Sequence, residues 1–308
     1  MDKRVIDIPY LLRFLLVKGI IVPFRSYGSA KRYKSIWTDN GSPLINITKQ
    51  LTQKVKDQTG NLVEYCMRYG NPTPESAFER LFQQEPKLDE VVLFPLFPHY
   101  AMSSYESAVE RVKDVVARMS KPMDLKIIPP YFQDEDYIAA LVDSIRPFMN
   151  KNFDHILFSY HGVPERHIRK SDVTGKHCLN STDCCSKVSQ AHANCYRHQL
   201  LKTTSLVCGQ LELPTENYSV SFQSRLGRDS WLQPFTTEVL KELPSKGVND
   251  LLLVCPAFVS DCLETLEEME IEGRSEFLKA GGRTFKMIPC LNVSQPWVQA
   301  IDEIIKKN

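Results

Sequence analysis

Residues 155–162, HILFSYHG, are the stretch of sequence that decides the fold. A short apolar run without regular polar alternation is typical of a strand buried on both faces. Residues 250–255 (DLLLVC) and 89–95 (DEVVLFP) repeat the pattern, and amphipathic segments that read as helices separate the runs. Such alternation predicts an α/β protein, doubly wound, with parallel sheets.

Weaker patterns add two further elements. Residues 218–223 (YSVSFQ) alternate apolar and polar side chains, so we expect a strand with one less deeply buried face. Ser103 and Glu106 have the Ser-x-x-Glu spacing of a capping box, which predicts the start of a helix that runs to about Met119.

Two prolines in residues 127–132 (IIPPYF) interrupt both periodicities and suggest a domain boundary. We therefore predict an N-terminal domain over residues 1–130 and a C-terminal domain over residues 131–295. A final helix over residues 296–308 is expected to pack back on the first domain, as is common when chain ends lie close together.

Composition limits the classes of partner and location. The 308 residues carry 38 Lys and Arg against 37 Asp and Glu, so no strong field indicates nucleic acid as a partner. The first residues do not predict a signal peptide, and Arg13 and Lys18 break the apolar run of residues 10–24. A partly buried helix is the favoured interpretation of that run, and a helix on a membrane surface is the alternative. We expect a cytoplasmic protein with possible peripheral membrane contact; the sequence leaves its oligomeric state open.

The carboxyl ends of the predicted strands are where an open α/β sheet binds its ligands. His161 ends the 155–160 run and precedes Gly162, which lets the backbone turn away and presents the imidazole. A histidine at a strand end is also often a core residue bonded to a carbonyl, so position alone leaves both interpretations open.

An acidic group follows the 250–255 run. Asp261 and Glu264 have the spacing of a helix start, with Asp261 as N-cap and Glu264 reaching back. Capping does not account for Glu268, which shares a helix face with Glu264. That face suits a cation path or a proton relay, and a solvated helix face is the alternative.

Three separated motifs give the chain a resemblance to the ferrochelatase family. Residues 159–172 (SYHGVPERHIRKSD) resemble the family's signature around its active-site histidine. Residues 255–272 (CPAFVSDCLETLEEMEIE) resemble the segment that supplies the facing glutamate, and residues 222–234 (FQSRLGRDSWLQP) the loop with a porphyrin-pocket tryptophan. Similarity at residues 25–44 and 91–105 extends the resemblance over essentially the whole chain.

The resemblance implies the chelatase fold, with two Rossmann-like domains and a cleft between them. It also implies an enzyme that inserts ferrous iron into protoporphyrin IX, with release of two protons, in the last step of heme biosynthesis. His161 and Glu264 would then be the metal-site pair, with Glu268 and Asp261 behind them. Coproporphyrin is an alternative substrate.

The resemblance further implies how the porphyrin is held. Trp231 and Tyr100 would form an aromatic wall, while Arg25 and Tyr33 would approach the propionates. Some family members have a histidine at the position that Cys262 occupies in this chain, so a role that requires histidine there is not expected here. A chelatase for sirohydrochlorin or a cobalt precursor is less consistent with the Trp231 loop.

Four of the nine cysteines fall within 18 residues. In a chain without a predicted secretory signal, this points to metal binding or redox chemistry before disulfides. Some ferrochelatases carry a 2Fe–2S cluster, and the resemblance implies one here, in an insertion over residues 173–198. One alternative is a zinc site that uses nearby histidines, and the other is four thiols without any metal. The four cysteines are Cys178, Cys184, Cys185 and Cys195, and the histidines are His177, His192 and His198.

The opening residues depart from the family pattern. Members usually begin with a strand resembling LLLxNLGTP, whereas residues 1–9 read MDKRVIDIP. We therefore expect the first domain to lack its opening strand, either through a start placed downstream or through truncation. A protein of a different class, an iron–sulfur sensor on an inactive chelatase scaffold, would have no reason to retain both His161 and Glu264.

Overall fold

Two parallel sheets organise the chain. The computed structural model describes residues 2–149, 153–225, 227 and 229–308, without the side chains of residues 20 and 24–26. In the described residues the larger sheet has the order β4-β3-β5-β6 and the smaller one pairs β1 with β2, all in parallel. The strands are β1 (Glu90–Leu93), β2 (Asp124–Ile127), β3 (His155–His161), β4 (Tyr218–Gln223), β5 (Asp250–Val254) and β6 (Thr284–Met287).

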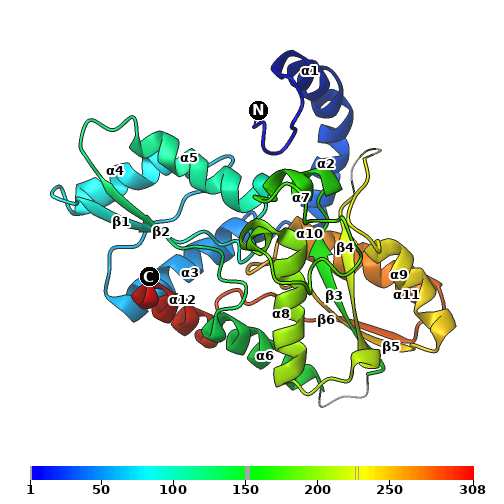
Figure 1. The fold of residues 1–308 in the computed structure, drawn as a ribbon. Coiled ribbons are helices and arrows are strands. Elements are labelled where there is room, and N and C mark those ends of the chain that lie inside the picture. Colours follow the sequence, from blue (N-terminus) through cyan, green and yellow to red (C-terminus); the bar gives the residue numbers. More distant parts are fainter. Residues whose placement is uncertain (1, 150–152, 226, 228) are drawn as a thin grey trace.

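Helices surround both sheets (Figure 1). In chain order the helical segments are α1 (Tyr10–Leu15), η1 (Leu16–Ile21), α2 (Val22–Ile36), α3 (Pro43–Thr59), α4 (Pro74–Gln84), η2 (Met102–Glu106), α5 (Ser107–Val116), α6 (Glu135–Met149), α7 (Glu165–Ser171), η3 (Gln190–Asn194), α8 (Tyr196–Gln210), η4 (Thr215–Asn217), α9 (Thr236–Glu242), η5 (Pro244–Lys246), α10 (Leu263–Thr265), η6 (Leu266–Gly273), α11 (Arg274–Lys279) and α12 (Gln295–Lys307). Three of the segments, η1, η2 and η6, are π-helical. The predicted α/β class with parallel sheets is confirmed.

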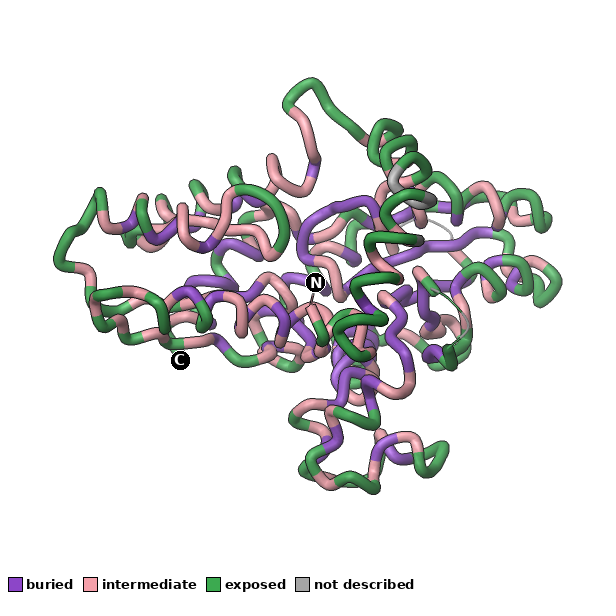
Figure 2. Tube along the Cα trace, turned by 90° about the horizontal axis from the view of Figure 1, so that it is seen from above, coloured by how far each residue is buried: buried purple, intermediate pink, exposed green. Residues whose placement is uncertain are grey.

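The central strands carry the most buried sequence. Every residue of β5 is buried, as is every residue of β3 except the last, and the buried segments run through the middle of the molecule (Figure 2). Strand β4 lies at the sheet edge, and its first three residues are half-buried whereas its last three are buried. Burial changes along the strand and does not alternate, so the predicted single less deeply buried face is wrong. Strand β1 has no fully buried residue, so the prediction that residues 89–95 form a strand buried on both faces is wrong. Strands β2 and β6 were not predicted, because their sequences, DLKI and TFKM, alternate polar and apolar residues and contain no continuous apolar run.

The capping box predicted at Ser103 and Glu106 is wrong. The N-cap is Ala101, and no side chain caps the helix. Glu106 instead accepts hydrogen bonds from the Tyr100 hydroxyl at 2.5 Å and from Arg4 Nε at 3.0 Å. Tertiary contacts with a charged donor therefore outcompete the local cap.

The apolar run near the start of the chain stands away from the body of the molecule (Figure 1). In α1 only Arg13 is buried, because it donates to the carbonyls of Ile6 and Ile8 in the segment before the helix. Leu11 and Leu12 are 68% and 56% exposed. The favoured interpretation of this run as a partly buried helix is therefore wrong for α1.

Helix α12 lies along α3 and α6. Its Trp297 is fully buried, with ring centroids 6.1 Å from Phe94, 5.9 Å from Tyr131 and 6.0 Å from Tyr137. This aromatic cluster joins the end of the chain to segments from its first half. The domain boundaries predicted above stay a prediction.

Candidate active site

The order of the larger sheet locates the ligand site. Strand β3 comes first in the chain, β4 pairs on one side of it and β5 on the other, so the direction of winding reverses between β3 and β5. Open α/β sheets bind ligands outside the carboxyl ends of the strands at such a reversal. His161 is the last residue of β3, and the acidic segment with Glu264 follows β5.

His161 has a defined tautomer. Its Nδ1 lies 2.7 Å from the carbonyl oxygen of Gly162. Because a carbonyl oxygen only accepts, Nδ1 carries the proton, and in the neutral ring Nε2 keeps its lone pair. The carbonyl of His161 in turn accepts from the Tyr196 hydroxyl at 2.9 Å. The side chain is half-buried and lies near Phe258, with ring centroids 6.2 Å apart.

Position 162 requires a glycine, because the backbone there lies very close to Gln223 and Trp231. A Cβ there would lie 2.9 Å from the carbonyl oxygen of Gln223 and 3.3 Å from the Trp231 ring. Its N–H donates to that same carbonyl at 2.8 Å, so the strand end cannot move away. Glycine therefore lets the backbone pass between β4 and the indole.

Glu264 is held by its backbone, and its side chain is not used in a cap. Gln223 Nε2 donates to the carbonyl of Glu264 at 2.9 Å. The predicted cap, with Asp261 as N-cap and Glu264 reaching back, is wrong. Cys262 is the N-cap, and its N–H donates to Thr265 Oγ1 at 3.0 Å.

Asp261 is buried and committed to other partners. Its Oδ2 accepts from Asn292 at 2.6 Å, and its Oδ1 accepts from the Thr265 hydroxyl at 3.0 Å. These bonds fix the loop between β5 and α10. The structure thus places Asp261 beneath the acidic segment.

Glu268 lies on η6 with a Ser224 hydroxyl donating to it at 2.5 Å. Burial and the neighbouring Glu264 raise the pKa of Glu268, while Ser224, His161 and Arg32 oppose the rise. Ser224 has φ of +66°, a left-handed conformation that costs a serine energy and that turns its hydroxyl toward this carboxylate. His161, Glu264 and Glu268 therefore share one electrostatic environment.

Helix α2 contacts η6. Arg32 Nη1 lies 3.9 Å from Glu268 Oε1, and the Tyr33 hydroxyl has a raised pKa because of burial and nearby Glu264. Arg25 is also on α2, but its side chain lies outside the described residues. The structure thus brings Tyr33 beside the predicted pair.

The remaining predicted wall residues differ in placement. Trp231 is buried, forms a bridge with Pro164, and its Nε1 has no hydrogen-bond partner among the described residues. Tyr100 directs its hydroxyl to Glu106, away from the group around His161.

Sequence reasoning missed four residues that contact or neighbour the acidic group. Gln223 ends β4 and Ser224 directly follows it, which was the available signal, but their partners are far along the chain. Nothing in the sequence pointed to Arg32. Glu267 is buried with no partner for Oε2 in the described part of the chain, and burial and Glu272 raise its pKa to about 7.

The four clustered cysteines come together, and three of them are buried. Cys184 Sγ and Cys185 Sγ lie 4.0 Å apart. The neighbouring Cys185 and Cys178 thiols lower the pKa of Cys195 against the effect of burial. The described residues nevertheless contain no group of three or more His, Cys, Asp or Glu side chains arranged to hold a metal ion.

The nearby histidines point to backbone groups. His177 Nε2 and His192 Nε2 lie 2.7 and 3.2 Å from the carbonyl oxygen of Cys184, and His198 Nδ1 lies 2.8 Å from that of Cys185. His192 and His198 are stacked, with centroids 3.6 Å apart. The rings therefore brace the loop and do not face the thiols as a ligand set.

Comparison with known proteins decides the family. A family model described as Ferrochelatase matches residues 1–308. The chain is 43% identical to the ferrochelatase of Ectopseudomonas mendocina and 42% identical to that of Pseudomonas syringae pv. tomato, each over 100% of this chain and 90% of the relative. The chain belongs to the ferrochelatase family. The predicted resemblance is confirmed, and with it an enzyme that inserts iron into a porphyrin.

Solved structures agree on the fold. SirB from Bacillus subtilis with Fe3+ superposes with a TM-score of 0.56 at 16% identity, covering 85% of this chain and 88% of that one. CbiX, the terminal enzyme of siroheme biosynthesis in denitrifying bacteria, gives 0.52 at 13% identity, covering 87% and 94%. At this identity they show the fold alone, and the predicted chelatase fold of this ferrochelatase-family chain is confirmed.

The hydrogen bond from Ser224 makes a prediction about pH. Removing it in Ser224→Ala takes away a donor to the ionised carboxylate, so the pKa of Glu268 rises further. Glu268 is then protonated at a higher pH, and the acid limb of iron insertion should move about one pH unit upward. Rate–pH profiles of the wild type, Ser224→Ala and the exposed control Ser245→Ala measure this; an unmoved acid limb in Ser224→Ala would contradict it.

Proposed function

We propose that the chain inserts ferrous iron into protoporphyrin IX at the site formed by His161, Glu264 and Glu268. The observation that carries the proposal is the tautomer of His161, which keeps the Nε2 lone pair, together with the electrostatic influence of His161 and Glu264 on the half-buried Glu268. Insertion exchanges Fe²⁺ for the two pyrrole N–H protons, so the site needs a base, a cation ligand and a proton outlet.

Each residue suits one of those needs. Nε2 of His161 accepts a pyrrole proton or binds the borderline Fe²⁺ ion. Glu264 would ligate the ion and displace its water. Glu268, with its raised pKa, takes up a proton more readily than an ordinary carboxylate does, and would carry it away from the porphyrin. Asp261 acts by holding the start of this segment.

The porphyrin would lie against Trp231 and Tyr100, with the propionates toward Arg25 and Tyr33. Burial of the indole, which leaves no room for a Cβ at Gly162, supports Trp231 as a rigid wall. The CLETLEE form of residues 262–268 resembles protoporphyrin-using relatives and favours protoporphyrin over coproporphyrin.

The assay is Fe²⁺ insertion under anaerobic conditions with each porphyrin in turn. We expect wild-type protein to prefer protoporphyrin IX and His161→Ala to lose at least about 10³-fold in kcat, because the base and ligand are both removed. The control is His155→Gln, at the other end of the same strand, where the histidine bonds Ser219. Substantial iron insertion by a folded His161→Ala variant would refute the role proposed for His161. Faster turnover of coproporphyrin than of protoporphyrin IX would make coproporphyrin the preferred substrate.

We also propose that the cysteine group holds a 2Fe–2S cluster. Four thiolates are the usual ligand set, and adjacent Cys184 and Cys185 can serve two different irons. The sulfurs lie together in a largely buried loop, and the low pKa of Cys195 favours the thiolate. Zinc is less well supported because the three histidines are bonded to carbonyls. A bound cluster would supply electron-transfer or iron-sensing capacity.

Visible absorption of protein purified without oxygen tests the cluster. We expect coloured wild-type protein with two irons and two sulfides per chain, and a colourless Cys195→Ser variant. Cys208→Ser, a buried cysteine outside the group, is the matched control and should keep the colour. Colourless wild-type protein with bound zinc would establish the zinc alternative. Wild-type protein that contains neither iron nor zinc would indicate four unligated thiols.

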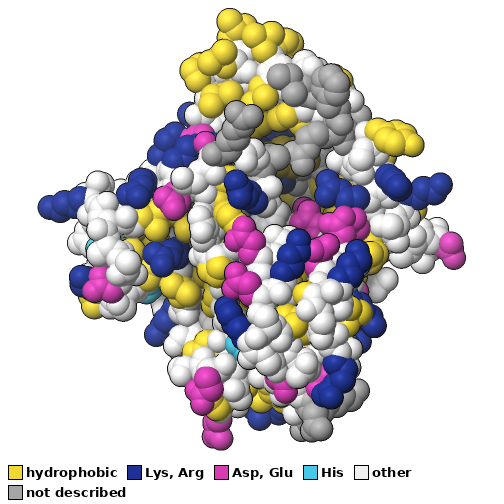
Figure 3. Space-filling model, turned by 90° about the vertical axis from the view of Figure 1, so that its right-hand side faces the viewer, with side chains coloured by type: hydrophobic (Ala, Val, Ile, Leu, Met, Phe, Trp, Pro, Cys, Tyr) yellow, Lys and Arg dark blue, Asp and Glu magenta, His cyan; other side chains and the backbone are white. Residues whose placement is uncertain are grey.

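Peripheral membrane contact is the third proposal. In the described residues no helix is both long enough and apolar enough to cross a bilayer. Hydrophobic side chains gather at the end of the molecule where α1 lies (Figure 3), among them Tyr10, Leu11, Leu12 and Leu15, each more than half exposed. An exposed apolar helix with Lys18 in the next turns suits a phospholipid surface. The predicted cytoplasmic location stays a prediction.

Co-sedimentation with phosphatidylcholine–phosphatidylglycerol vesicles tests this contact. We expect the wild type to bind and the double variant Leu11→Glu, Leu12→Glu to bind at least about ten-fold more weakly. The variant loses two leucine side chains that would be buried in the bilayer. Leu278→Glu changes an exposed leucine on α11 and should bind like the wild type. Equal binding by all three proteins would reject α1 as the contact.

A further inference from the structure

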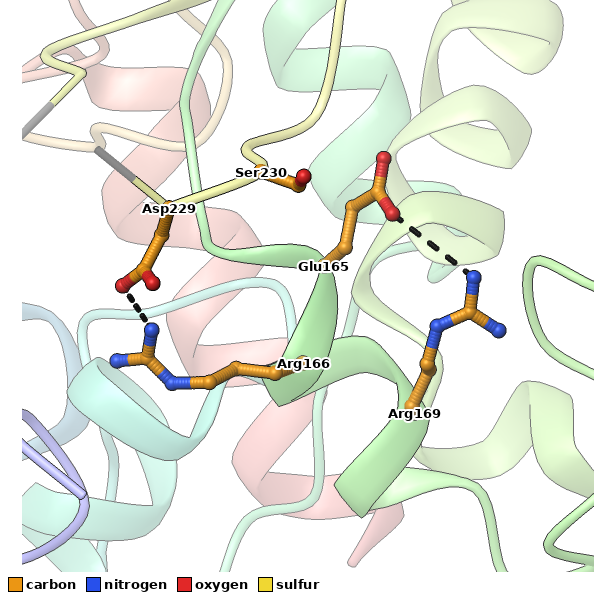
Figure 4. A pocket seen from close by; sticks show the side chains of 5 residues that line it. All are labelled: Glu165, Arg166, Arg169, Asp229 and Ser230. Atoms are coloured by element: carbon orange, nitrogen blue, oxygen red, sulfur yellow. Dashed lines mark hydrogen bonds and ion pairs between the residues drawn. The ribbon is translucent and has the colours of Figure 1, made fainter. Parts of the chain in front are cut away.

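The short helix α7, which lies within the motif of residues 159–172, contacts several other segments of the chain. Glu165, Arg166, Arg169, Asp229 and Ser230 line a cavity of about 210 Å³ (Figure 4). Arg169 turns from this cavity toward the cysteine loop, where it donates to the carbonyls of Cys178 and Leu179. Arg166 turns the other way.

Arg166 bridges two segments that are distant in sequence. Its Nε donates to Asp7 Oδ1 at 2.7 Å, and its Nη1 forms an ion pair with Asp229. Lys170 also pairs with Asp7, whose side chain is only 7% exposed. Burial alone would raise the pKa of Asp7, but the Lys170 and Arg166 hydrogen bonds lower it, so the carboxylate stays ionised.

Both segments bound by Arg166 belong to the surroundings of the proposed porphyrin pocket. Asp229 lies two residues before Trp231, and the backbone there is already paired with the His161 motif. Glu165 N–H donates to the Ser230 carbonyl at 2.9 Å, and Leu232 N–H donates to the Val163 carbonyl at 3.1 Å. Asp7 lies three residues before α1, the start of the helical segment that reaches Arg32 and Tyr33 through η1 and α2.

We propose that Arg166 is a positioning residue for porphyrin binding, which ties the Trp231 loop and the segment before α1 to the same helix. The proposal rests on the function proposed above. A planar guanidinium can donate hydrogen bonds to two carboxylates in fixed directions. A lysine ammonium is a compact point charge and holds two carboxylates in a less defined geometry. Arg166 does not contact the reacting atoms, so its loss should affect how the porphyrin is held and leave the insertion step intact.

Steady-state kinetics of Arg166→Gln, Arg166→Lys and Arg111→Gln test the proposal. Arg111 is the matched control, because it is also partly exposed and pairs with one carboxylate, Glu75, at 2.6 Å. We expect Arg166→Gln to raise KM for porphyrin roughly five-fold while kcat and KM for Fe²⁺ stay within about two-fold. Arg166→Lys should fall between it and the wild type. Porphyrin KM for Arg166→Gln equal to that of Arg111→Gln would overturn the proposal.

Hydrogen exchange gives a readout that does not depend on activity. We expect the amides of Ile6, bonded to Asp2, and of Leu232 to exchange faster together in Arg166→Gln and to stay protected in Arg111→Gln. Faster exchange in only one segment, or in neither, would overturn the coupling. Wild-type protein that fails to insert iron would refute the proposed function, while the exchange result would still decide whether Arg166 joins the two segments.

Discussion

The hydrogen bonds of Gln223 are the constraint on which the site depends. The backbone carbonyl of Gln223 accepts from Gly162, and its side chain donates to the carbonyl of Glu264 and accepts from the Ser159 hydroxyl at 2.8 Å. One buried residue at the end of an edge strand thus fixes both the histidine strand and the acidic helix. Because buried amides must be satisfied, this arrangement has few alternatives, and Gln223 links the backbone beside His161 to that of Glu264.

A second constraint is electrostatic. Carboxylates on a π-helical segment packed under α2 lose part of their hydration, which explains the raised pKa of Glu267 and Glu268. Arg32 and Ser224 offset part of the cost without neutralising the group completely. In the proposed site, an acidic face kept in this intermediate state would bind a dication and also exchange protons, and both properties are needed when Fe²⁺ replaces two protons. Insertions of the π-helical kind are common at functional sites.

The local sequence predicted an element correctly where a single local requirement, such as burial on both faces of a strand, determines the structure. Strands β3 and β5 were predictable because burial on both faces requires continuous apolar residues, and His161 was found because it follows such a strand. Strands β2 and β6 were missed because four alternating residues carry too little signal. The cap at Ser103 failed because Tyr100 and Arg4 compete for Glu106, and the cap at Asp261 failed because Asn292, 31 residues away, takes its carboxylate. The roles of Gln223, Ser224 and Arg32 depend on contacts across the fold, which no local pattern contains.

The histidine, the glycine and the tryptophan form a single mechanical unit. Nδ1 of His161 bonds the carbonyl of Gly162, so the direction of the Nε2 lone pair depends on the backbone at the glycine. That backbone can lie where it does only because no Cβ separates it from Gln223 and the Trp231 ring. A displacement of the indole would therefore be resisted by the Gly162 backbone, which is linked to the imidazole by the Nδ1 hydrogen bond. In the proposed site the orientation of His161 and the position of Trp231 are thus not independent, and a macrocycle seated on Trp231 would meet a histidine already turned by the backbone that packs near the indole.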